Sequence, residues 1–336
     1  MNEIRERLTS LSGPGPLMGV GTWAIGGPTW ATDGKPIGWG EVDDAESIRA
    51  IHAALDAGIR LIDTADVYGA GHSERLIGQA ILGRRDEVIL VSKFGCLYDD
   101  ATRAFTGVME TADTAYVRRA CEASLRRLGV DAIDVYLLHP SEFSIDDAET
   151  IRRTLEALVG EGKIRSYGWS TDDVAQARTM APDAGCSTIE MELSLFNDAQ
   201  PGLLQLCDEH DLVSLNRSAL AMGLLTGEYD RASVLPADDI RGNSPAWLTW
   251  LDGGKPRPEL LDRLDAVREI LTSGGRTVAQ GALAWIWGRS DRTVPIPGFR
   301  RVGQVVGLAG ARAFGPLTPN EMAEVSRLLA TEPVPA

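Results

Sequence analysis

The chain has 336 residues, of which 48 are acidic and 33 basic, so its formal net charge at pH 7 is −15. A negative field repels nucleic acids and anionic membrane surfaces, and we expect neither as a partner. No apolar stretch approaches the roughly 20 residues that cross a bilayer, and the charged N-terminus lacks the apolar segment of a secretory signal. No linker divides the chain, which predicts one soluble, cytoplasmic domain over residues 1–336.

Cysteine and histidine are scarce and scattered. The cysteines are Cys96, Cys121, Cys186 and Cys207, and none belongs to a CxxC pair. The four histidines show neither an HxH nor an HExxH spacing. Zinc sites and secreted disulfide frameworks need such clusters, so we expect reduced thiols and no bound metal.

Eight short apolar runs indicate buried strands. They cover residues 18–22, 59–63, 88–93, 134–139, 164–170, 189–192, 212–217 and 293–297. Between them, apolar residues recur at helical spacing in the stretches 47–57, 74–82, 115–128, 148–161, 172–180 and 202–210. Alternating strands and helices form a parallel sheet, and eight such strands close a barrel. The sequence therefore predicts an α/β fold, the (β/α)8 or TIM barrel.

A doubly wound parallel sheet is the alternative fold. Such a sheet usually carries a G-x-G-x-x-G phosphate loop between its first strand and helix, and the chain has none there. Two stretches interrupt the alternation, at about residues 99–114 and 230–258. Long connections in a barrel overhang its catalytic face, so we expect both to shape a substrate pocket.

Polar residues close three successive strands. Asp63 ends one strand and is followed by Tyr68, Lys93 ends the next, and His139 ends the third. Each of these residues alone has a structural explanation, such as a turn cap or a solvated charge. The carboxyl ends of barrel strands, however, meet at one mouth, where catalytic groups lie. We therefore expect the four side chains to form one site.

These residue types suit proton transfer. Burying Lys93 without a counter-charge would cost several kcal/mol, so we expect Asp63 to pair with it. A phenol has a pKa of about 10 and donates a proton at neutral pH only when its anion is stabilised. We therefore expect the Lys93 ammonium to lower the pKa of Tyr68. His139 would hydrogen-bond a substrate oxygen or join the proton relay.

Six sequence motifs occur in a fixed order along nearly the whole chain. They are DTADVYG, VSKFG, YLLHP, LVGEGKIRSYGWS, LAMGLLTG and VPIPGFR. Together they resemble the signatures of the aldo-keto reductase superfamily. The resemblance implies a TIM barrel, NADPH as cofactor, the reversible reduction of an aldehyde or ketone, and a catalytic tetrad of Asp63, Tyr68, Lys93 and His139.

The same resemblance implies a set of residues that bind NADPH. They are Gly21, Thr22, Trp23, Asp63, Ser170, Thr171, Glu190, Arg217, Ser218, Leu220, Met222, Pro297, Gly298, Arg300 and Gln304. Arg300 also has a physical argument, because a guanidinium at a helix N-terminus attracts the 2′-phosphate that distinguishes NADPH from NADH.

Several cofactor positions depart from the family's usual residues. The family commonly has Asn at Thr171, Gln at Glu190 and Tyr or Trp at Arg217, and Leu308 replaces an adenine contact. We expect weaker adenine contacts and altered nicotinamide binding. Glu190 would either favour the cationic, oxidised nicotinamide or form an ion pair with Arg217.

Aromatic residues suggest the substrate. The preferred pocket residues are Trp23, Trp30, Tyr98, Trp169 and Trp247, which suit a bulky apolar carbonyl compound.

Two other functions remain open. One is a nucleotide-binding redox sensor of the same fold with little turnover, and the other is an isomerase or dehydratase that transfers protons without hydride. A homo-oligomer is compatible with the sequence.

Overall fold

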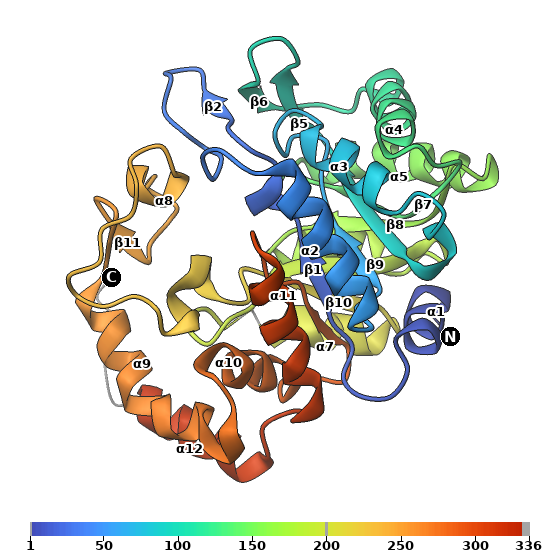
Figure 1. Cartoon of the computed structure of the whole chain (residues 1–336). Coiled ribbons are helices and arrows are strands. Elements are labelled where there is room, and N and C mark those ends of the chain that lie inside the picture. The colour runs from blue at the N-terminus through green and yellow to red at the C-terminus, as the bar shows by residue number, and fades with distance from the viewer. Residues whose placement is uncertain (1, 199–200, 331–336) are drawn as a thin grey trace.

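The computed structural model describes residues 2–198 and 201–330 (Figure 1). The expected limits of the domain, residues 1 and 336, lie outside the described residues. Eight parallel strands form one sheet in the order β1-β3-β4-β7-β8-β9-β10-β13. Their bounds are β1 (Gly19–Gly21), β3 (Leu61–Asp63), β4 (Ile89–Phe94), β7 (Ile133–Leu138), β8 (Ile164–Ser170), β9 (Cys186–Glu192), β10 (Val213–Arg217) and β13 (Thr293–Pro295).

The two edges of this sheet meet. Gly21 at the end of β1 forms a parallel bridge with Gly298, just after β13, and its N–H donates to the Pro297 carbonyl at 3.1 Å. Residues of the eight strands fall within or next to the predicted runs. The (β/α)8 barrel is thereby confirmed, and the doubly wound sheet is excluded because its edges would stay apart.

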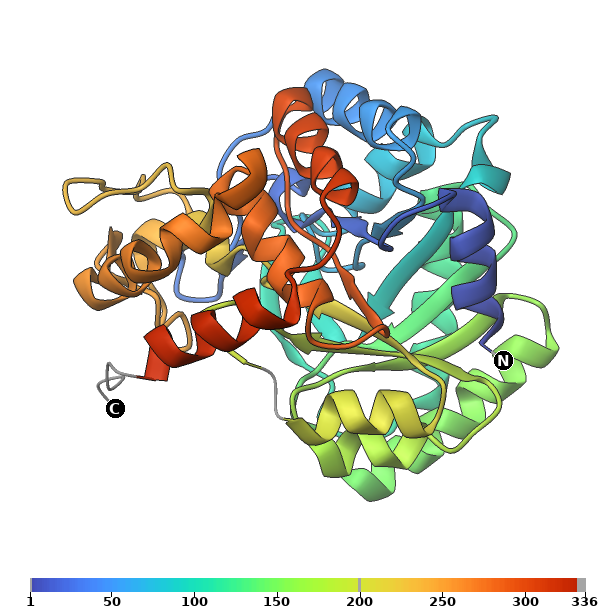
Figure 2. The ribbon, with the colours of Figure 1, turned by 90° about the horizontal axis from the view of Figure 1, so that it is seen from below.

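Helices surround the barrel (Figures 1 and 2). Those that each follow a barrel strand are α2 (Asp44–Asp56), α3 (His72–Ala80), α4 (Thr114–Leu128), α5 (Ile145–Gly160), α6 (Val174–Met180), α7 (Pro201–Glu209), α10 (Val278–Trp287) and α11 (Val302–Ala309). Several begin at a side-chain cap: Asp43, Asp113, Ser144 and Asp173 each accept a hydrogen bond from a backbone N–H of the first turn. The six predicted helices are all present.

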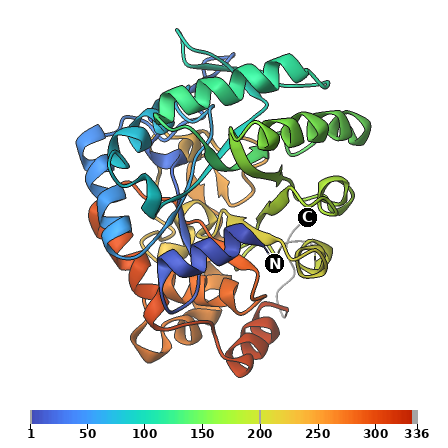
Figure 3. The same ribbon diagram turned by 90° about the vertical axis from the view of Figure 1, so that its right-hand side faces the viewer.

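The predicted helical stretches do not cover α10, and they also miss three helices that lie outside the strand–helix alternation. These three are α1 (Glu3–Ser12), α9 (Pro258–Leu271) and α12 (Pro319–Ala330). Figure 3 shows α1 lying across one end of the barrel, where Ile4 and Leu8 join the interior cluster. Helix α9 packs against α12. None of the helices in the described residues is long and apolar enough to cross a membrane.

Side chains alternate between the barrel interior and the helices. Small and branched apolar residues such as Leu61, Val91 and Leu137 fill the interior, whereas Tyr136 and Leu138 pack outward against the helices. Towards the carboxyl ends of the strands the interior positions become polar. That end of the barrel, called the mouth below, contains Asp63, Lys93, Ser170 and Glu190.

The two expected loops contain secondary structure. The first becomes part of a hairpin, because β5 (Cys96–Asp99) pairs with β6 (Ala104–Val108), and β2 (Trp30–Ala31) joins its far edge. The second contains α8 (Ile240–Asn243) and the short strands β11 (Leu251–Asp252) and β12 (Lys255–Pro256). Both segments follow the carboxyl ends of barrel strands, β4 and β10, as predicted.

Candidate active site

A buried lysine organises the mouth of the barrel. The ammonium Nζ of Lys93 lies 2.6 Å from Oδ1 of Asp63, 3.1 Å from the Thr64 carbonyl and 3.3 Å from the phenol oxygen of Tyr68. Lys93 has no exposed surface and Asp63 is also buried. The predicted Asp63–Lys93 ion pair is present, and it brings the Tyr68 hydroxyl into hydrogen-bonding reach of the ammonium.

A second carboxylate faces the same ammonium. Oε2 of Glu190, on β9, lies 3.3 Å from Nζ of Lys93, and Oε1 accepts a hydrogen bond of 3.2 Å from the Ser170 hydroxyl. Glu190 is 1% exposed. Sequence reasoning expected this residue to contact the nicotinamide and did not anticipate its contact with Lys93. The sequence contained part of the signal for this contact, because the alternation of side chains along a strand directs residue 190 toward the barrel interior.

Arg217 does not form the ion pair with Glu190 that is one of the two predicted alternatives. Its guanidinium pairs instead with Glu192, at 3.0 Å, and with Asp172. Glu192 lies directly opposite Arg217 in the β9–β10 register, whereas Glu190 lies opposite Leu215, deeper in the barrel. That part of the expectation was wrong because Glu192 and Asp172 are nearer partners at the rim.

The charges in this cluster shift one another. Burial lowers the pKa of Lys93, but the carboxylates of Asp63 and Glu190 outweigh it, and the net shift is upward. Burial raises the pKa of Asp63 to about 8, with Lys93 opposing the shift and Glu190 adding to it. Lys93 is therefore a firmly charged ammonium, whereas Asp63 takes up a proton far more readily than an exposed carboxylate does.

The pKa of Tyr68 is raised rather than lowered. Burial of the phenol is the largest cause, and Lys93 opposes it as predicted, but Asp63 and Glu190 push the pKa further up. The expectation was right about the sign of the lysine contact and wrong about the net result, because it counted one carboxylate and ignored desolvation.

His139 lies beside the phenol. The rings of Tyr68 and His139 are 5.8 Å apart between centroids and meet at 81°. Burial lowers the pKa of His139 well below its ordinary value, and the positive charges of Lys93 and Arg217 add to this shift. The imidazole is therefore neutral at physiological pH. Its Nδ1 is buried and has no hydrogen-bond partner within the described residues.

A tight turn positions Tyr68. The Tyr68 N–H donates to the Ala65 carbonyl at 3.2 Å, and Gly69 follows with φ +62°. A Cβ atom at Gly69 would lie 1.8 Å from the carbonyl oxygen of Gly26, so only glycine permits this approach. The turn is thus held against the segment that follows β1, and the phenol points toward Lys93.

Predicted cofactor residues at the N-terminal strand line the same region. Gly21 closes the barrel, and the Thr22 hydroxyl donates to the Asp63 carbonyl at 2.8 Å. The indole of Trp23 stacks on the Tyr68 ring, with centroids 6.1 Å apart. The Ser170 hydroxyl donates to Glu190, whereas the buried Thr171 hydroxyl donates to Gln176 at 2.6 Å.

The segment after β10 has a strained backbone. Ser218, Ala221 and Met222 all adopt the left-handed conformation, with φ of 56°, 46° and 54°. This conformation is costly for residues with a side chain and clusters at functional sites. Ser218, Leu220 and Met222 were predicted to bind the cofactor, and the strained backbone supports a functional role for this segment.

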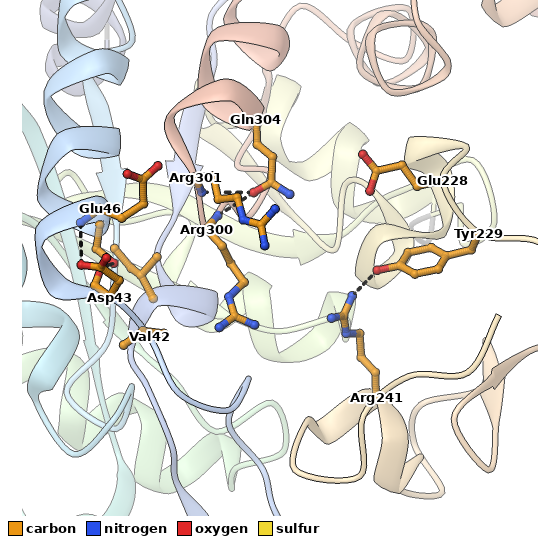
Figure 4. A pocket seen from close by; sticks show the side chains of 11 residues that line it. Val42, Asp43, Glu46, Glu228, Tyr229, Arg241, Arg300, Arg301 and Gln304 are labelled. Carbon is orange, nitrogen blue, oxygen red and sulfur yellow. Dashed lines mark hydrogen bonds between the residues drawn. The ribbon is translucent and has the colours of Figure 1, made fainter.

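A cavity of about 590 Å³ lies at the start of α11 (Figure 4). Arg300, Arg301 and Gln304 line it on one side, and Tyr229 and Arg241 line it on the other. Pro297 and Gly298 precede these residues at the closing seam of the barrel. Three guanidinium groups around one cavity fit an anion such as the phosphates of a dinucleotide.

Sequence reasoning missed several groups around this cavity. Tyr229 and Arg241 belong to the long segment after β10, and nothing in the sequence indicates that this segment folds back beside α11. Glu46 also lines the cavity, and its Oε1 accepts a hydrogen bond of 2.9 Å from the Val302 N–H. Arg300 donates to the carbonyls of Trp39 and Glu41, which tethers it to the segment after β1.

Two of the five preferred substrate residues, Trp23 and Trp247, are linked to Tyr68 by ring contacts. Trp247 packs against Trp23, with centroids 6.4 Å apart, and Trp23 stacks on Tyr68. Trp39 meets Trp23 edge on, at 5.7 Å. Trp247 is 61% exposed and Trp39 is partly buried. These three indoles form an aromatic wall at the mouth.

The other three preferred residues lie elsewhere. Trp169 faces outward from β8, is fully buried and donates its indole N–H to the Pro140 carbonyl at 2.8 Å. Tyr98 lines a separate cavity of about 240 Å³ with Asp66 and Arg127. Trp30 lies on β2, paired with β6. Trp169 faces outward because side chains alternate along a strand and its two neighbours, Gly168 and Ser170, face inward.

No group of three or more His, Cys, Asp or Glu side chains in the described part of the chain could hold a metal ion.

Comparison with known proteins identifies relatives over almost the full length. Residues 17–330 match the model of the Aldo/keto reductase family. The chain is 32% identical over 299 residues to Aldo-keto reductase YhdN of Bacillus subtilis (strain 168), which covers 87% of this chain and 83% of that protein.

Solved structures show the same similarity. The glycerol dehydrogenase AKR11B4 from Gluconobacter oxydans has a TM-score of 0.79 and 33% identity, covering 96% of this chain and 95% of its own. An aldo/keto reductase from Klebsiella pneumoniae in complex with NADP and acetate has a TM-score of 0.65 and 30% identity, covering 94% and 91%.

Proposed function

The chain belongs to the aldo/keto reductase family, and from this premise we propose that it reduces an aldehyde or ketone to an alcohol with Tyr68 as the proton donor. NADPH is the cofactor, as in the neighbouring structures solved with it. When bound, NADPH supplies the hydride that adds to the carbonyl carbon.

The observation that carries the proposal is the 3.3 Å contact between the Lys93 ammonium and the Tyr68 hydroxyl. Addition of hydride to a carbonyl leaves negative charge on its oxygen, which must receive a proton. The Tyr68 O–H gives up that proton, and the adjacent ammonium stabilises the phenolate that remains. Asp63 keeps Lys93 charged and oriented.

Neutral His139 completes the arrangement. With its ring against that of Tyr68, the imidazole can donate a hydrogen bond from a ring N–H to the same carbonyl oxygen. Such a donor acts where charge develops in the transition state. His139 thereby orients the substrate oxygen toward the Tyr68 hydroxyl.

The aromatic wall supports a substrate class. Trp23, Trp39 and Trp247 offer flat apolar surface beside the proton donor, which favours an aromatic or otherwise bulky apolar carbonyl compound. Binding of NADPH is supported by the cavity beside α11, whose arginines suit the phosphates.

Replacement of Tyr68 by Phe tests the proposal, because it removes only the hydroxyl. We expect turnover with aromatic aldehydes and ketones, followed by NADPH absorbance, to fall about 10²–10⁴-fold, since general acid catalysis contributes that much. NADPH binding, measured by quenching of tryptophan fluorescence, should be unchanged. A Tyr68→Phe enzyme as fast as wild type would refute the role of Tyr68, and wild type that binds NADPH without turnover would favour a nucleotide sensor.

A further inference from the structure

The cluster around Lys93 contains more negative than positive charge. Lys93, Asp63 and Glu190 are 0%, 3% and 1% exposed, and both carboxylates lie within 3.3 Å of the one ammonium. If both acids were ionised, one buried negative charge would have no counter-charge. Uncompensated charge in a protein interior costs several kcal/mol, so such a site binds a proton or a cation.

The hydrogen bonds around the ammonium show which carboxylate lacks a partner. The three N–H groups of Lys93 donate to Asp63, the Thr64 carbonyl and Tyr68. Oε2 of Glu190 approaches the ammonium but accepts no hydrogen bond from the described residues. This buried carboxylate oxygen therefore has a free lone pair that a proton would satisfy.

The other cations near the cluster have ion-pair partners of their own. Arg217, on β10, pairs with Glu192 and Asp172. Arg127 pairs with Glu74 on the outer side of the barrel, and the nearby Asp66 carboxylate interacts with these two residues and, less strongly, with Lys93. Neutral His139 contributes no charge. Arg217 also interacts electrostatically with Glu190, but its contacts are with Glu192 and Asp172. Lys93 is therefore the one described cation that contacts the second carboxylate.

We propose that Glu190 is a positioning residue of the proton relay, which together with Asp63 retains one extra proton in the buried cluster and releases it when a cation occupies the mouth. The proton sits on one of the two carboxyl groups in the resting enzyme. When it leaves, the O–H bond breaks, the electron pair stays on the carboxylate oxygen, and the proton passes to the solvent.

The cation in question is the oxidised nicotinamide. This part of the inference rests on the proposed function, because it assumes that the cofactor ring binds beside Tyr68. NADP⁺ carries a positive ring and NADPH a neutral one, while their phosphates are identical. Only NADP⁺ can therefore compensate the second carboxylate, so only NADP⁺ should displace the proton.

A first experiment is independent of the cofactor. Infrared difference spectra of wild type minus Glu190→Gln at pH 7 should contain the carbonyl band of one neutral carboxyl group, whichever of the two acids carries the proton. Any band from Asp66 cancels in the difference. Glu192→Gln is the matched control, because it removes a carboxylate from the same face of the same strand without touching Lys93.

The outcomes of this experiment are distinct. A band present in wild type and Glu192→Gln but lost in Glu190→Gln supports the proposal. Absence of the difference band, or an equal loss in Glu192→Gln, overturns it. If Glu190→Gln fails to fold, two other variants replace it: Glu190→Asp, which retains both acids, and Asp63→Asn, which removes one. A carboxyl band that is present in Glu190→Asp and absent in Asp63→Asn supports the proposal.

The second experiment measures proton release. Calorimetric titration with NADP⁺ and with NADPH, in two buffers of different ionisation enthalpy at pH 7, gives the protons released per cofactor. We expect up to about one more proton for NADP⁺ than for NADPH in wild type and Glu192→Gln, and no difference in Glu190→Gln. An equal release for both cofactors in wild type would refute the linkage. Loss of turnover in Tyr68→Phe with this linkage intact would show that the two proposals stand separately.

Discussion

Lys93 has no exposed surface, yet burial does not neutralise it. Two carboxylates, Asp63 and Glu190, hold its pKa above the ordinary value although desolvation acts in the opposite direction. The acids are affected as well: Asp63 takes up a proton more readily than an exposed aspartate does. Where the family commonly has a neutral glutamine, a glutamate at position 190 changes the charge of the cluster without changing its size.

This charge balance predicts a pH-dependent stability. The pKa of Asp63 is raised from 3.8 to about 8 in the folded protein, so between these values the folded state binds the proton and the unfolded state does not. The contribution to stability is complete below about pH 4 and declines as the pH rises toward 8. In Glu190→Gln this decline should be smaller, because burial still raises the pKa of Asp63 but the repulsion from Glu190 is gone.

Denaturant unfolding of both proteins between pH 5 and 8 measures the effect. We expect the unfolding free energy of wild type to fall more steeply with pH than that of Glu190→Gln, by up to about 1.4 kcal/mol per pH unit. The comparison cancels other groups, including His139, whose lowered pKa acts in the opposite direction. Parallel curves would contradict the coupling of Glu190 to Asp63.

At the scale of elements, strand β8 approaches β9 unusually closely. The pairing register shifts between Tyr167 and Gly168, and a Cβ atom at Gly168 would lie 1.8 Å from the carbonyl oxygen of Thr188. Glycine thus allows the two backbones to meet inside the barrel. The contact also sets the position of Ser170 and Glu190, two residues further along these strands.

Replacement of Gly168 by Ala should force β8 and β9 apart. We expect a loss of about 1–3 kcal/mol in unfolding free energy, as for other overpacked interior sites, measured by denaturant unfolding. Gly160→Ala at the end of α5 is the control, because no atom lies within 4 Å of its added Cβ. Equal stability of the two variants would show that the barrel absorbs the methyl group without strain.

At the scale of the whole molecule, segments that follow β1 and β10 join over the mouth. Trp39 bridges Asp239, and the Ile240 N–H donates to the Gly38 carbonyl at 2.9 Å. Arg241 holds this junction: it is 8% exposed, pairs with Asp239, and lies over the Trp39 ring at 4.3 Å. It also donates to the Met222 carbonyl at 3.1 Å.

Arg241→Met should loosen this junction, because it leaves the buried Asp239 carboxylate without its partner. Arg241 also lines the cavity beside α11, so we expect the Kd for NADPH to rise about tenfold or more. Arg231→Met is the control, since that arginine pairs with Asp262 on the surface. Fluorescence titration measures the Kd for NADPH of both variants. An unchanged Kd in Arg241→Met would show that this junction does not contribute to cofactor binding.

The sequence by itself determined the barrel and predicted which strand ends carry Asp63, Tyr68, Lys93 and His139. Both follow from local rules: apolar periodicity defines strands and helices, and parallel strands bring their carboxyl ends together. The Asp63–Lys93 pair followed from the cost of burying a lone ammonium. These inferences need only neighbouring strands.

Only the tertiary structure decided which groups meet across the barrel. Glu190 is 97 residues from Lys93, and its choice of Lys93 over Arg217 depends on depth within the barrel. The raised pKa of Tyr68 depends on burial, which no residue pattern measures. Trp169 faces outward because parity on β8 places Gly168 and Ser170 inside. Long connections such as the one containing Arg241 have no periodicity, so the sequence did not indicate where they fold back.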